Sequence, residues 1–287
     1  MKKILITGAN GQLGSELQYL GKDYPQYELL LTDYAELDIT NLHAVLDFVK
    51  GDGLYAVINC AAYTAVDKAE TESEKAYLIN ETGAAHLAQA ASQVGAKFVH
   101  ISTDFIFDGT HSLPILEDDS PNPLSVYGTS KLAGEKAVMA ANPESIIFRT
   151  SWVYSSYGAN FVKTILRLCR ERESLSIICD QIGTPTYARD LAEMILATLD
   201  TVVAKKIIGV FNYSDEGVAS WYDFAIAIRD ISRLPTTILP IETTQYPTPA
   251  TRPKYSVLNK RKIKETFHLE IPYWRSSLKA CLALLQE

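Results

Sequence analysis

The chain has 287 residues, with 27 Lys and Arg against 34 Asp and Glu, so its formal net charge is −7. Hydrophobic residues make up 47% of it and charged residues 21%, which is a globular composition with material for one large domain or two smaller ones. The acidic balance, without a basic run, argues against nucleic acid as a partner. No apolar stretch reaches the ~18 residues that a membrane helix needs, so we expect no membrane contact.

The four cysteines, Cys60, Cys169, Cys179 and Cys281, are scattered and form no CxxC pair. They are typical of small core residues in a reducing compartment rather than of disulfides or metal ligands. The five histidines show no zinc spacing, and the apolar run at the start of the chain ends at Gly8, too early for a signal sequence. The sequence therefore predicts a cytoplasmic protein.

Short apolar runs alternate with helical patterns through the first half of the chain. The runs predict strands at residues 3–7, 28–32, 56–60, 97–102 and 145–150. The patterns predict helices at residues 12–19, 41–50, 72–94 and 127–141. Because these strands are almost continuously apolar, we expect a parallel sheet that is covered on both faces.

Beyond Trp152 this rhythm changes. Helical patterns cover residues 161–172, 188–199 and 221–232, short strands are expected at 174–178 and 210–213, and the proline-rich segment 240–253 is mostly loop. We therefore predict an α/β fold of two parts. Residues 1–153 are expected to form a Rossmann-type domain with a doubly wound parallel sheet, and residues 154–287 mainly a smaller α/β lobe. Some segments after residue 153 are expected to return to the first domain.

The segment Gly8-Ala9-Asn10-Gly11-Gln12-Leu13-Gly14 follows a predicted strand and opens a predicted helix. Its glycines allow a tight turn, a close approach of the backbone to a pyrophosphate, and close packing of the helix on the sheet. The helix N-terminus offers free N–H groups and the positive end of its dipole to the anion. The segment predicts a dinucleotide site, with a merely structural turn as the alternative.

Asp33 ends the second predicted strand, where a carboxylate binds the hydroxyls of an adenosine ribose. A carboxylate at this place favours NADH over NADPH because it repels a 2′-phosphate. The alternative is a solvated turn residue.

Tyr127 and Lys131 stand at i and i+4, so they share one face of a predicted helix. A free tyrosine has a pKa of about 10, but a neighbouring ammonium stabilises the phenolate and tunes proton transfer. Taken alone, this pair is typical of a surface helix. Together with the glycine turn and the strand end Ser102-Thr103-Asp104, it predicts a site for redox chemistry.

These three elements together resemble the extended short-chain dehydrogenase/reductases. Phe105 stands where the nucleotide-sugar 4,6-dehydratases of that superfamily carry a glutamate base, so a dehydratase is not expected. Further segments are similar to the dTDP-4-dehydrorhamnose reductases within the superfamily, and they lie at residues 65–70, 102–109, 127–135, 149–154 and 246–253.

The resemblance implies roles for individual residues. The catalytic residues would be Tyr127 as proton donor, Lys131, which lowers the tyrosine pKa and orients the cofactor, and Thr103, which binds the carbonyl. The expected cofactor contacts include residues of the glycine turn. They are Gly8, Gly11, Gln12, Leu13, Gly14, Asp33, Asp38, Ile39, Ala61, Ala62, Tyr63, Thr64, Asn80, Ile101, Tyr127 and Lys131. The expected substrate contacts are Thr103, Asp104, Trp152 and Arg252.

Two of the substrate contacts also have a physical reason. An indole face suits the apolar C–H face of a pyranose, which favours Trp152, with a core tryptophan as the alternative. The planar fork of a guanidinium matches phosphate oxygens, which makes Arg252 the candidate for a diphosphate, with a surface arginine as the alternative.

The activity implied is reduction of the 4-keto group of a dTDP-4-dehydro-6-deoxy-L-sugar to dTDP-L-rhamnose, with a nucleotide sugar as substrate. The resemblance implies NADPH as the cofactor, while Asp33 argues for NADH, so both stay open. Some relatives form a dimer bridged by Mg²⁺. Glu16 matches one bridging glutamate, but Arg189 stands where another is expected, so we expect no metal. Monomer and homodimer both stay open.

Two alternatives to this activity remain. One is a non-catalytic, NADP-binding regulatory subunit that resembles the β subunit of methionine adenosyltransferase. The other is a reductase or epimerase of another nucleotide sugar. The nucleotide base and the stereochemistry of the sugar rest on the resemblance alone.

Overall fold

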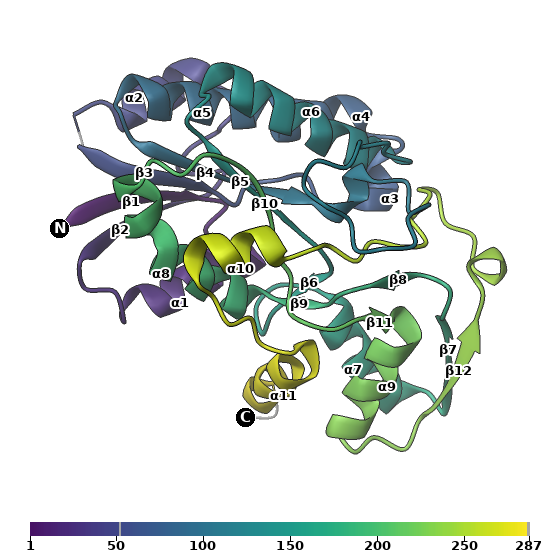
Figure 1. Ribbon diagram of the computed structural model, residues 1–287. Helices are drawn as coiled ribbons and strands as arrows, with labels where there is room; N and C mark the ends of the chain where they lie inside the picture. The colour runs from purple at the N-terminus through teal and green to yellow at the C-terminus, as the bar shows by residue number, and fades with distance from the viewer. Residues whose placement is uncertain (52, 286–287) are drawn as a thin grey trace.

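The centre of the protein is a six-stranded sheet, as the computed structural model of residues 1–51 and 53–285 shows (Figure 1). Its strands are all parallel and run in the order β10-β5-β4-β3-β1-β2. Their bounds are β1 (Lys2–Thr7), β2 (Tyr27–Thr32), β3 (Leu54–Asn59), β4 (Lys97–Thr103), β5 (Ile146–Thr150) and β10 (Gly209–Asn212). The predicted parallel α/β sheet is therefore confirmed.

Helices cover both faces of this sheet (Figure 1). One face packs against α2 (Leu42–Val49), α5 (Ala84–Gln93) and α6 (Val126–Ala141), and the other against α1 (Gln12–Gly21) and α8 (Ala188–Ala204). Along β1, Ile4 and Ile6 join the core cluster of α1 and α8, whereas Leu5 joins that of α2 and α5. Since successive side chains of a strand point to opposite faces, two covered faces require the continuous apolar runs seen in the sequence.

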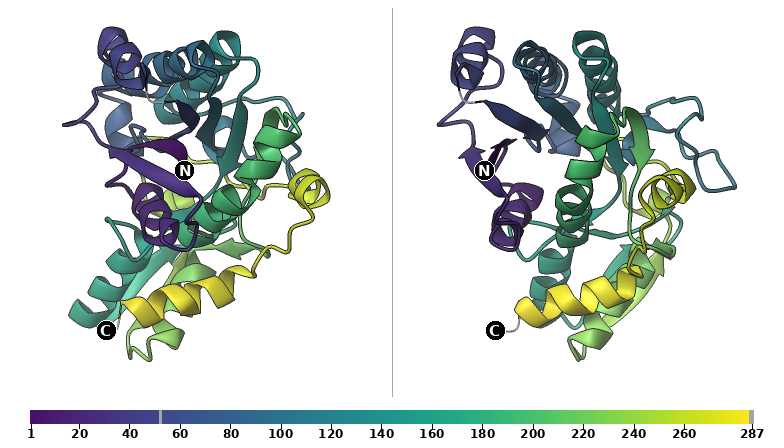
Figure 2. Two further views of the ribbon diagram at one scale, coloured as in Figure 1. Left: turned by 90° about the vertical axis from the view of Figure 1, so that its left-hand side faces the viewer. Right: turned by 60° about the vertical axis from the view of Figure 1, so that its left-hand side comes forward.

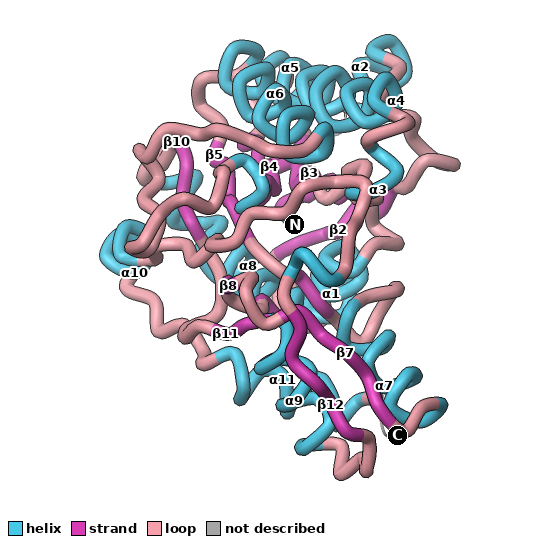
Figure 3. The backbone as a smooth tube through the Cα atoms, turned by 90° about the vertical axis from the view of Figure 1, so that its right-hand side faces the viewer, coloured by secondary structure: helices cyan, strands magenta, loops and turns pink. Residues whose placement is uncertain are grey.

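A second lobe lies beyond the carboxyl ends of the strands (Figure 2). It contains α7 (Phe161–Glu171), α9 (Trp221–Ile231) and α11 (Trp274–Leu284), whose apolar faces share one core cluster. Figure 3 shows β7 and β12 side by side, away from the central sheet. The strands of this lobe are β6 (Val153–Tyr154), β7 (Ser174–Ile178), β8 (Ile182–Gly183), β9 (Thr186–Tyr187), β11 (Ala219–Ser220) and β12 (Thr237–Ile241).

The chain crosses between the lobes more than once. Strand β10 adds to the edge of the sheet beside β5, and α8 packs on α1, although both follow Trp152 in sequence. The division at residue 153 stays a prediction. In the described part of the chain, every helix is too short or too polar to cross a membrane.

The helix predicted over residues 72–94 is interrupted. It consists of α4 (Ser73–Tyr77), the π-helical turn η1 (Leu78–Gly83) and α5. Asn80 lies inside this wide turn, a feature that often accompanies functional sites. The remaining short elements are α3 (Val66–Ala69), the 3₁₀ turns η2 (Asp104–Ile106) and η3 (Thr243–Gln245), and α10 (Arg261–Phe267). Thus the segment 240–253, expected to be mostly loop, also carries the end of β12 and η3.

Candidate active site

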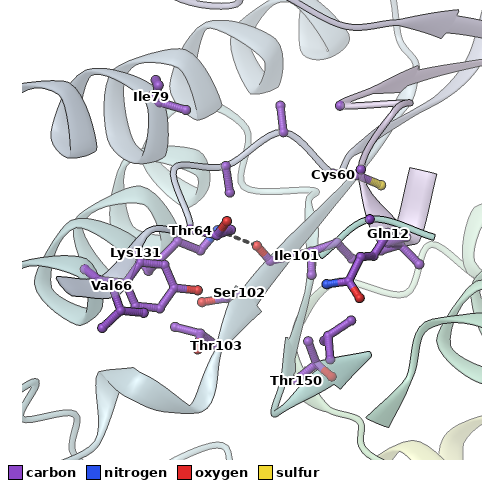
Figure 4. Close-up of a pocket in the computed structure, with 18 of the residues that line it drawn as sticks. Gln12, Cys60, Thr64, Val66, Ile79, Ile101, Ser102, Thr103, Lys131 and Thr150 are labelled. Atoms are coloured by element: carbon purple, nitrogen blue, oxygen red, sulfur yellow. Dashed lines mark hydrogen bonds between the residues drawn. The ribbon is translucent and has the colours of Figure 1, made fainter. Parts of the chain in front are cut away.

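A cavity of about 790 Å³ lies at the carboxyl ends of the central strands, between the two lobes (Figure 4). Ligands bind at this edge in open parallel sheets because loops of successive strands meet there. All the site residues predicted from the sequence line this cavity except Gly14, Tyr63 and Asn80. The fold therefore brings together, in one cavity, predicted site residues that are far apart in the chain.

The glycine turn between β1 and α1 forms one wall of the cavity. Gly8 has a φ of +65°, and a Cβ atom there would lie 2.6 Å from the backbone nitrogen of Ala61. A Cβ atom on Gly14 would lie 2.4 Å from the carbonyl oxygen of Gly8, so Gly14 serves the packing of α1 rather than the cavity surface. Gly11 precedes α1 without any side-chain cap. The first N–H groups of α1 are therefore available to an anion.

The loop after β2 forms the far end of the cavity. The Asp33 carboxylate accepts hydrogen bonds from the backbone nitrogens of Asn10 (3.0 Å) and Tyr34 (2.8 Å), so it also holds the glycine turn. Asp38 accepts bonds from both the backbone and the hydroxyl of Thr40. The lining residues of this loop thus include two carboxylates and no cationic side chain.

Helix α6 presents the tyrosine and the lysine to the cavity. Ser125 caps its N-terminus by accepting a bond from the backbone nitrogen of Gly128 (3.2 Å). Lys131 is 2% exposed, and its Nζ donates to the carbonyl oxygen of Ile101 at 2.6 Å (Figure 4). Burial lowers the pKa of Lys131 to about 8, which leaves the ammonium charged at neutral pH.

The phenol of Tyr127 lies beside Thr103, at the end of β4. Burial raises the pKa of Tyr127 to about 12, and a hydrogen bond with Thr103 opposes that rise. The phenol therefore holds its proton at neutral pH in the absence of a ligand. The ring of Phe105 meets the Tyr127 ring edge-on, with 5.6 Å between their centroids, so an apolar side chain occupies the place where the dehydratases carry a base.

Asp104 is 1% exposed and adjoins the Thr103 hydroxyl. Thr103 Oγ1 donates to Asp104 Oδ1 at 3.0 Å, while Asp104 Oδ2 makes no hydrogen bond among the described residues, although the nearby Ser256 side chain, like Thr103, acts to lower the pKa of the carboxyl. Burial raises the pKa of this carboxyl to about 6. An unpaired, buried acceptor at the cavity wall is suited to a ligand hydroxyl.

Trp152 lies against a second tryptophan that the sequence did not identify. The rings of Trp152 and Trp221 are stacked, with 3.7 Å between their centroids and 7° between their planes. Trp152 has a φ of +49°, an uncommon conformation for a residue other than glycine. One indole face of Trp152 is thus already covered by Trp221, and Gly183 packs closely on the same ring, since a Cβ atom there would lie 2.7 Å from Trp152 Cε2.

Arg252 is tied to the first lobe rather than free at the surface. Its Nη1 donates to Asp67 Oδ1 (3.0 Å) and its Nη2 to Asp67 Oδ2 (2.7 Å), while Nη1 also donates to Thr248 Oγ1 (2.7 Å). This bidentate pair lowers the pKa of Asp67. Within the described chain, Nε–H and one Nη2–H of Arg252 have no acceptor, and together they form a second fork.

Asn80 and Tyr63 stand behind the cavity wall. The Asn80 side chain accepts a bond from the Tyr63 backbone nitrogen (2.8 Å) and donates to the Tyr63 carbonyl oxygen (3.1 Å) and to Ser130 Oγ (2.9 Å). It thus fastens the loop after β3 to α6, next to Lys131. The predicted contact of these two residues with the cofactor stays a prediction.

The sequence reasoning missed several lining residues, namely Tyr34, Thr150, Trp221 and the segment Gly158–Asn160. Tyr34 directly follows Asp33, so its position in the chain was a usable signal. Trp221 and Asn160 come from the second lobe, and no local pattern shows that they reach this cavity.

Glu16, which the resemblance relates to a metal-bridged dimer, is bonded within the chain, and the expected absence of a metal stays a prediction. Its Oε1 accepts a bond from Ser155 Oγ (2.7 Å) and its Oε2 from Arg189 Nε (2.7 Å), so both carboxylate oxygens are occupied within the chain. Among residues 1–51 and 53–285, no group of three or more His, Cys, Asp and Glu residues is arranged to hold a metal ion.

The parallel sheet, the glycine turn and the Tyr127–Lys131 pair place the protein in the class of short-chain dehydrogenase/reductases. More narrowly, the chain belongs to the family described as RmlD substrate binding domain, whose model matches residues 1–287. It is 42% identical to the dTDP-4-dehydrorhamnose reductase of Aggregatibacter actinomycetemcomitans, over 97% of this chain and 98% of that one.

Two crystal structures give the same result. The structure of a dTDP-4-dehydrorhamnose reductase from Clostridium acetobutylicum matches with a TM-score of 0.94 at 45% identity, covering 99% of this chain and 100% of the other. The structure of dTDP-4-dehydrorhamnose reductase from Bacillus anthracis in complex with NADP matches with a TM-score of 0.93 at 40% identity, covering 99% of both chains. The resemblance recognised in the sequence is confirmed.

Proposed function

We propose that this protein reduces the 4-keto group of a dTDP-4-dehydro-6-deoxy-L-sugar to give dTDP-L-rhamnose, with NADPH or NADH as the hydride source. The observation that carries the proposal is the meeting of Tyr127, Lys131 and Thr103 in the cavity that also contains the glycine turn. The relative from Aggregatibacter actinomycetemcomitans bears the name of this reductase at 42% identity.

The reaction follows from the positions of these three side chains. When bound, the reduced nicotinamide supplies a hydride to C4 of the sugar. Tyr127 donates its phenolic proton to the carbonyl oxygen as negative charge develops there, so the ketone becomes an alcohol and Tyr127 a phenolate. The Lys131 ammonium stabilises the phenolate, and the Thr103 hydroxyl holds the same oxygen. Solvent then returns a proton to Tyr127.

Three further residues would hold the nucleotide sugar. The unpaired Oδ2 of Asp104 would accept a bond from a sugar hydroxyl. The uncovered surface of Trp152 would pack on the apolar face of the pyranose. The free fork of Arg252 would bind the diphosphate, because the other cation among the described lining residues, Lys131, lies on α6 and serves Tyr127.

The loop after β2 lines the cavity with two carboxylates and no cationic side chain. This end of the cavity therefore repels a 2′-phosphate and favours NADH. The relative from Bacillus anthracis was nevertheless crystallised with NADP. We propose that the protein accepts both dinucleotides and has the lower KM for NADH.

We further propose a cytoplasmic location. All four cysteines are free thiols, and two of them, Cys169 and Cys281, are buried. Thiols persist in a reducing compartment, whereas an oxidising one favours disulfides.

The test is a panel of nucleotide 4-ketosugars, varied in base and in sugar configuration, assayed with NADH and with NADPH in parallel. We expect the dTDP-4-dehydro-6-deoxy-L-sugar to be reduced with the highest kcat/KM. Dinucleotide binding without turnover of any ketosugar would contradict the proposal and favour the non-catalytic regulatory subunit. Preference for another base or sugar would favour a different nucleotide-sugar reductase.

A further inference from the structure

The segment 155–160, between β6 and α7, crosses from the second lobe to the start of α1. There Asn160 Nδ2 donates a hydrogen bond to Gln12 Oε1 at 3.0 Å. Both residues line the cavity, and Gln12 is the first residue of α1, beside the glycine turn. Neither the glycine motif nor the Tyr–Lys pair gives Asn160 a role.

The orientation of the Asn160 amide is fixed by its other partners. Its Oδ1 accepts a bond from the Lys163 backbone nitrogen (3.1 Å) and so caps α7. Its Nδ2 also donates to the carbonyl oxygens of Ser155 (2.7 Å) and Tyr157 (3.3 Å). A flipped amide would place oxygen against carbonyl oxygen and nitrogen against N–H, so only this orientation satisfies its neighbours.

This orientation in turn fixes the Gln12 amide. Because Asn160 offers a donor, Gln12 must offer Oε1 to it, and Gln12 Nε2 must point elsewhere. In Figure 4 the nitrogen of Gln12 lies on the side that faces Ile101, within the cavity. Nε2 has no acceptor among the described residues. A side-chain donor with two free hydrogens thus lies next to the N–H groups that begin α1.

The segment itself is held on α1 by bonds that do not involve Asn160. Ser155 Oγ donates to Glu16 on α1 (2.7 Å) and accepts from the Tyr157 backbone nitrogen (2.9 Å), and Glu16 is paired with Arg189 (2.7 Å). Gly158 faces Gln12 closely, since a Cβ atom there would lie 3.1 Å from Gln12 Cγ. The second lobe is therefore positioned against the cofactor turn before any ligand arrives.

We propose that Asn160 is a positioning residue for the dinucleotide: it turns the Gln12 amide so that Nε2 donates to the diphosphate. The inference rests on the proposed function, because it requires that a nicotinamide dinucleotide occupies the cavity. It assigns to the second lobe a part in cofactor binding, in addition to its part in substrate binding.

The test uses Asn160→Asp in the full-length protein. An aspartate still accepts the bond from Lys163 but cannot donate, so Gln12 must turn Nε2 toward it and present Oε1 to the diphosphate. We expect the Kd for NADH and for NADPH, measured by fluorescence titration, to rise about tenfold, the loss typical of one hydrogen bond to a charged group. Asn259→Asp is the matched control, because Asn259 accepts a backbone bond from Arg261 away from the cavity and its change adds the same charge.

A double-mutant cycle with Gln12→Leu separates amide positioning from charge repulsion and loop displacement. In the Gln12→Leu background, Asn160→Asp should change the Kd less than about twofold, since no amide remains to be turned. An equal effect in both backgrounds, or no effect in the native background, would overturn the inference.

If Asn160→Asp lowers the Tm so far that binding cannot be measured, Asn160→Ser serves as the second variant. Serine keeps an N-cap oxygen but does not reach Gln12, and we expect a rise of about threefold in Kd that again disappears in the Gln12→Leu background. A rise that persists in that background, or no rise, would overturn the inference. Failure of the native protein to bind either dinucleotide would instead contradict the proposed function.

Discussion

Burial shifts the pKa values of Tyr127 and Lys131 in opposite directions, each toward its neutral form. The phenol has a pKa of about 12 and the ammonium a pKa of about 8, so at neutral pH both still carry their protons. This is the protonation state that a ketone reduction needs, with a proton donor beside a cation. Above pH 8, Lys131 loses its charge, and the transition state loses the group that stabilises the phenolate.

We expect the Asp104 carboxylate to lower the free energy of unfolding, although it helps to bind the nucleotide sugar. Its folded-state pKa of about 6 lies above that of an exposed carboxyl, so folding becomes less favourable as the pH rises from about 4 to 6 and stays so above it. We predict that Asp104→Asn raises the free energy of unfolding at pH 7.5 by up to about 3 kcal/mol, and by less at pH 5. Urea unfolding at the two pH values measures this.

The same variant should raise the KM for the nucleotide sugar, because an amide cannot give a sugar hydroxyl the same acceptor. Asp108→Asn is a suitable control, since the pKa of that half-buried carboxyl is lowered to about 2 by its bonds to Thr110 and Asn122. A stability gain for Asp104→Asn that is equal at both pH values would contradict the assignment.

Residue identities could be predicted where a local pattern carries them. The glycines of the turn, Asp33 and the Tyr127–Lys131 pair each depend on a few neighbouring positions, and of these residues all but Gly14 line the cavity. Partners across the lobes could not be predicted, because nothing near Arg252 indicates Asp67, which lies 185 residues away. The Trp152–Trp221 stack and the Asn160–Gln12 hydrogen bond could not be predicted from the sequence for the same reason.

At the level of single elements, the close packing of α6 on η2 fixes the positions of Tyr127 and Lys131. A Cβ atom on Gly128 would lie 2.2 Å from the carbonyl oxygen of Phe105. We predict that Gly128→Ala destabilises the fold by about 2–3 kcal/mol and displaces Tyr127, lowering kcat. Denaturant unfolding and steady-state kinetics measure the two effects.

The matched control is Gly21→Ala in α1, where the added methyl meets mainly the end of the flexible Leu29 side chain. It should cost clearly less stability and leave kcat unchanged. Equal costs for the two variants would show that the contact between α6 and η2 does not fix the site.

Element boundaries followed from the sequence where burial alone decides them. The strands of the sheet are apolar because helices cover both faces, and their positions were predicted within a few residues. The π-helical turn at residues 78–83 was not predicted, because Asn80 stabilises it through bonds to Tyr63 and Ser130 that exist only in the folded chain. A helical pattern in the sequence carries no sign of such a turn.

At the scale of the whole molecule, polar contacts join the two lobes beside the cavity. Arg252 pairs with Asp67, and Ser155, in the segment after β6, donates to Glu16 on α1, which is fully buried and also pairs with Arg189 of α8. Because a buried carboxylate needs its partners, the bond from Ser155 to Glu16 favours one relative position of the lobes. The sequence predicted two lobes and repeated crossing of the chain, but not the contacts that set how they meet.

We predict that Arg252→Lys raises the KM for the nucleotide sugar about tenfold and leaves the Kd for NADH unchanged. A lysine retains the charge but has no planar fork with which to hold Asp67 and a diphosphate at once. Arg275→Lys, at an exposed position of α11, is the control. A parallel loss of dinucleotide binding would show that Arg252 acts on the whole cavity rather than on the substrate.

The proposed reaction depends above all on the Tyr127 phenol, which gives its proton to a ketone held beside a bound nicotinamide. The most direct measurement is Tyr127→Phe, in which single-turnover reduction of the ketosugar and the Kd for NADPH are determined on the same preparation. We predict that reduction slows at least about a hundredfold while the Kd changes less than about twofold. The control Tyr273→Phe, at a side chain that is 50% exposed, should match the native protein. Near-native reduction by Tyr127→Phe would contradict the account.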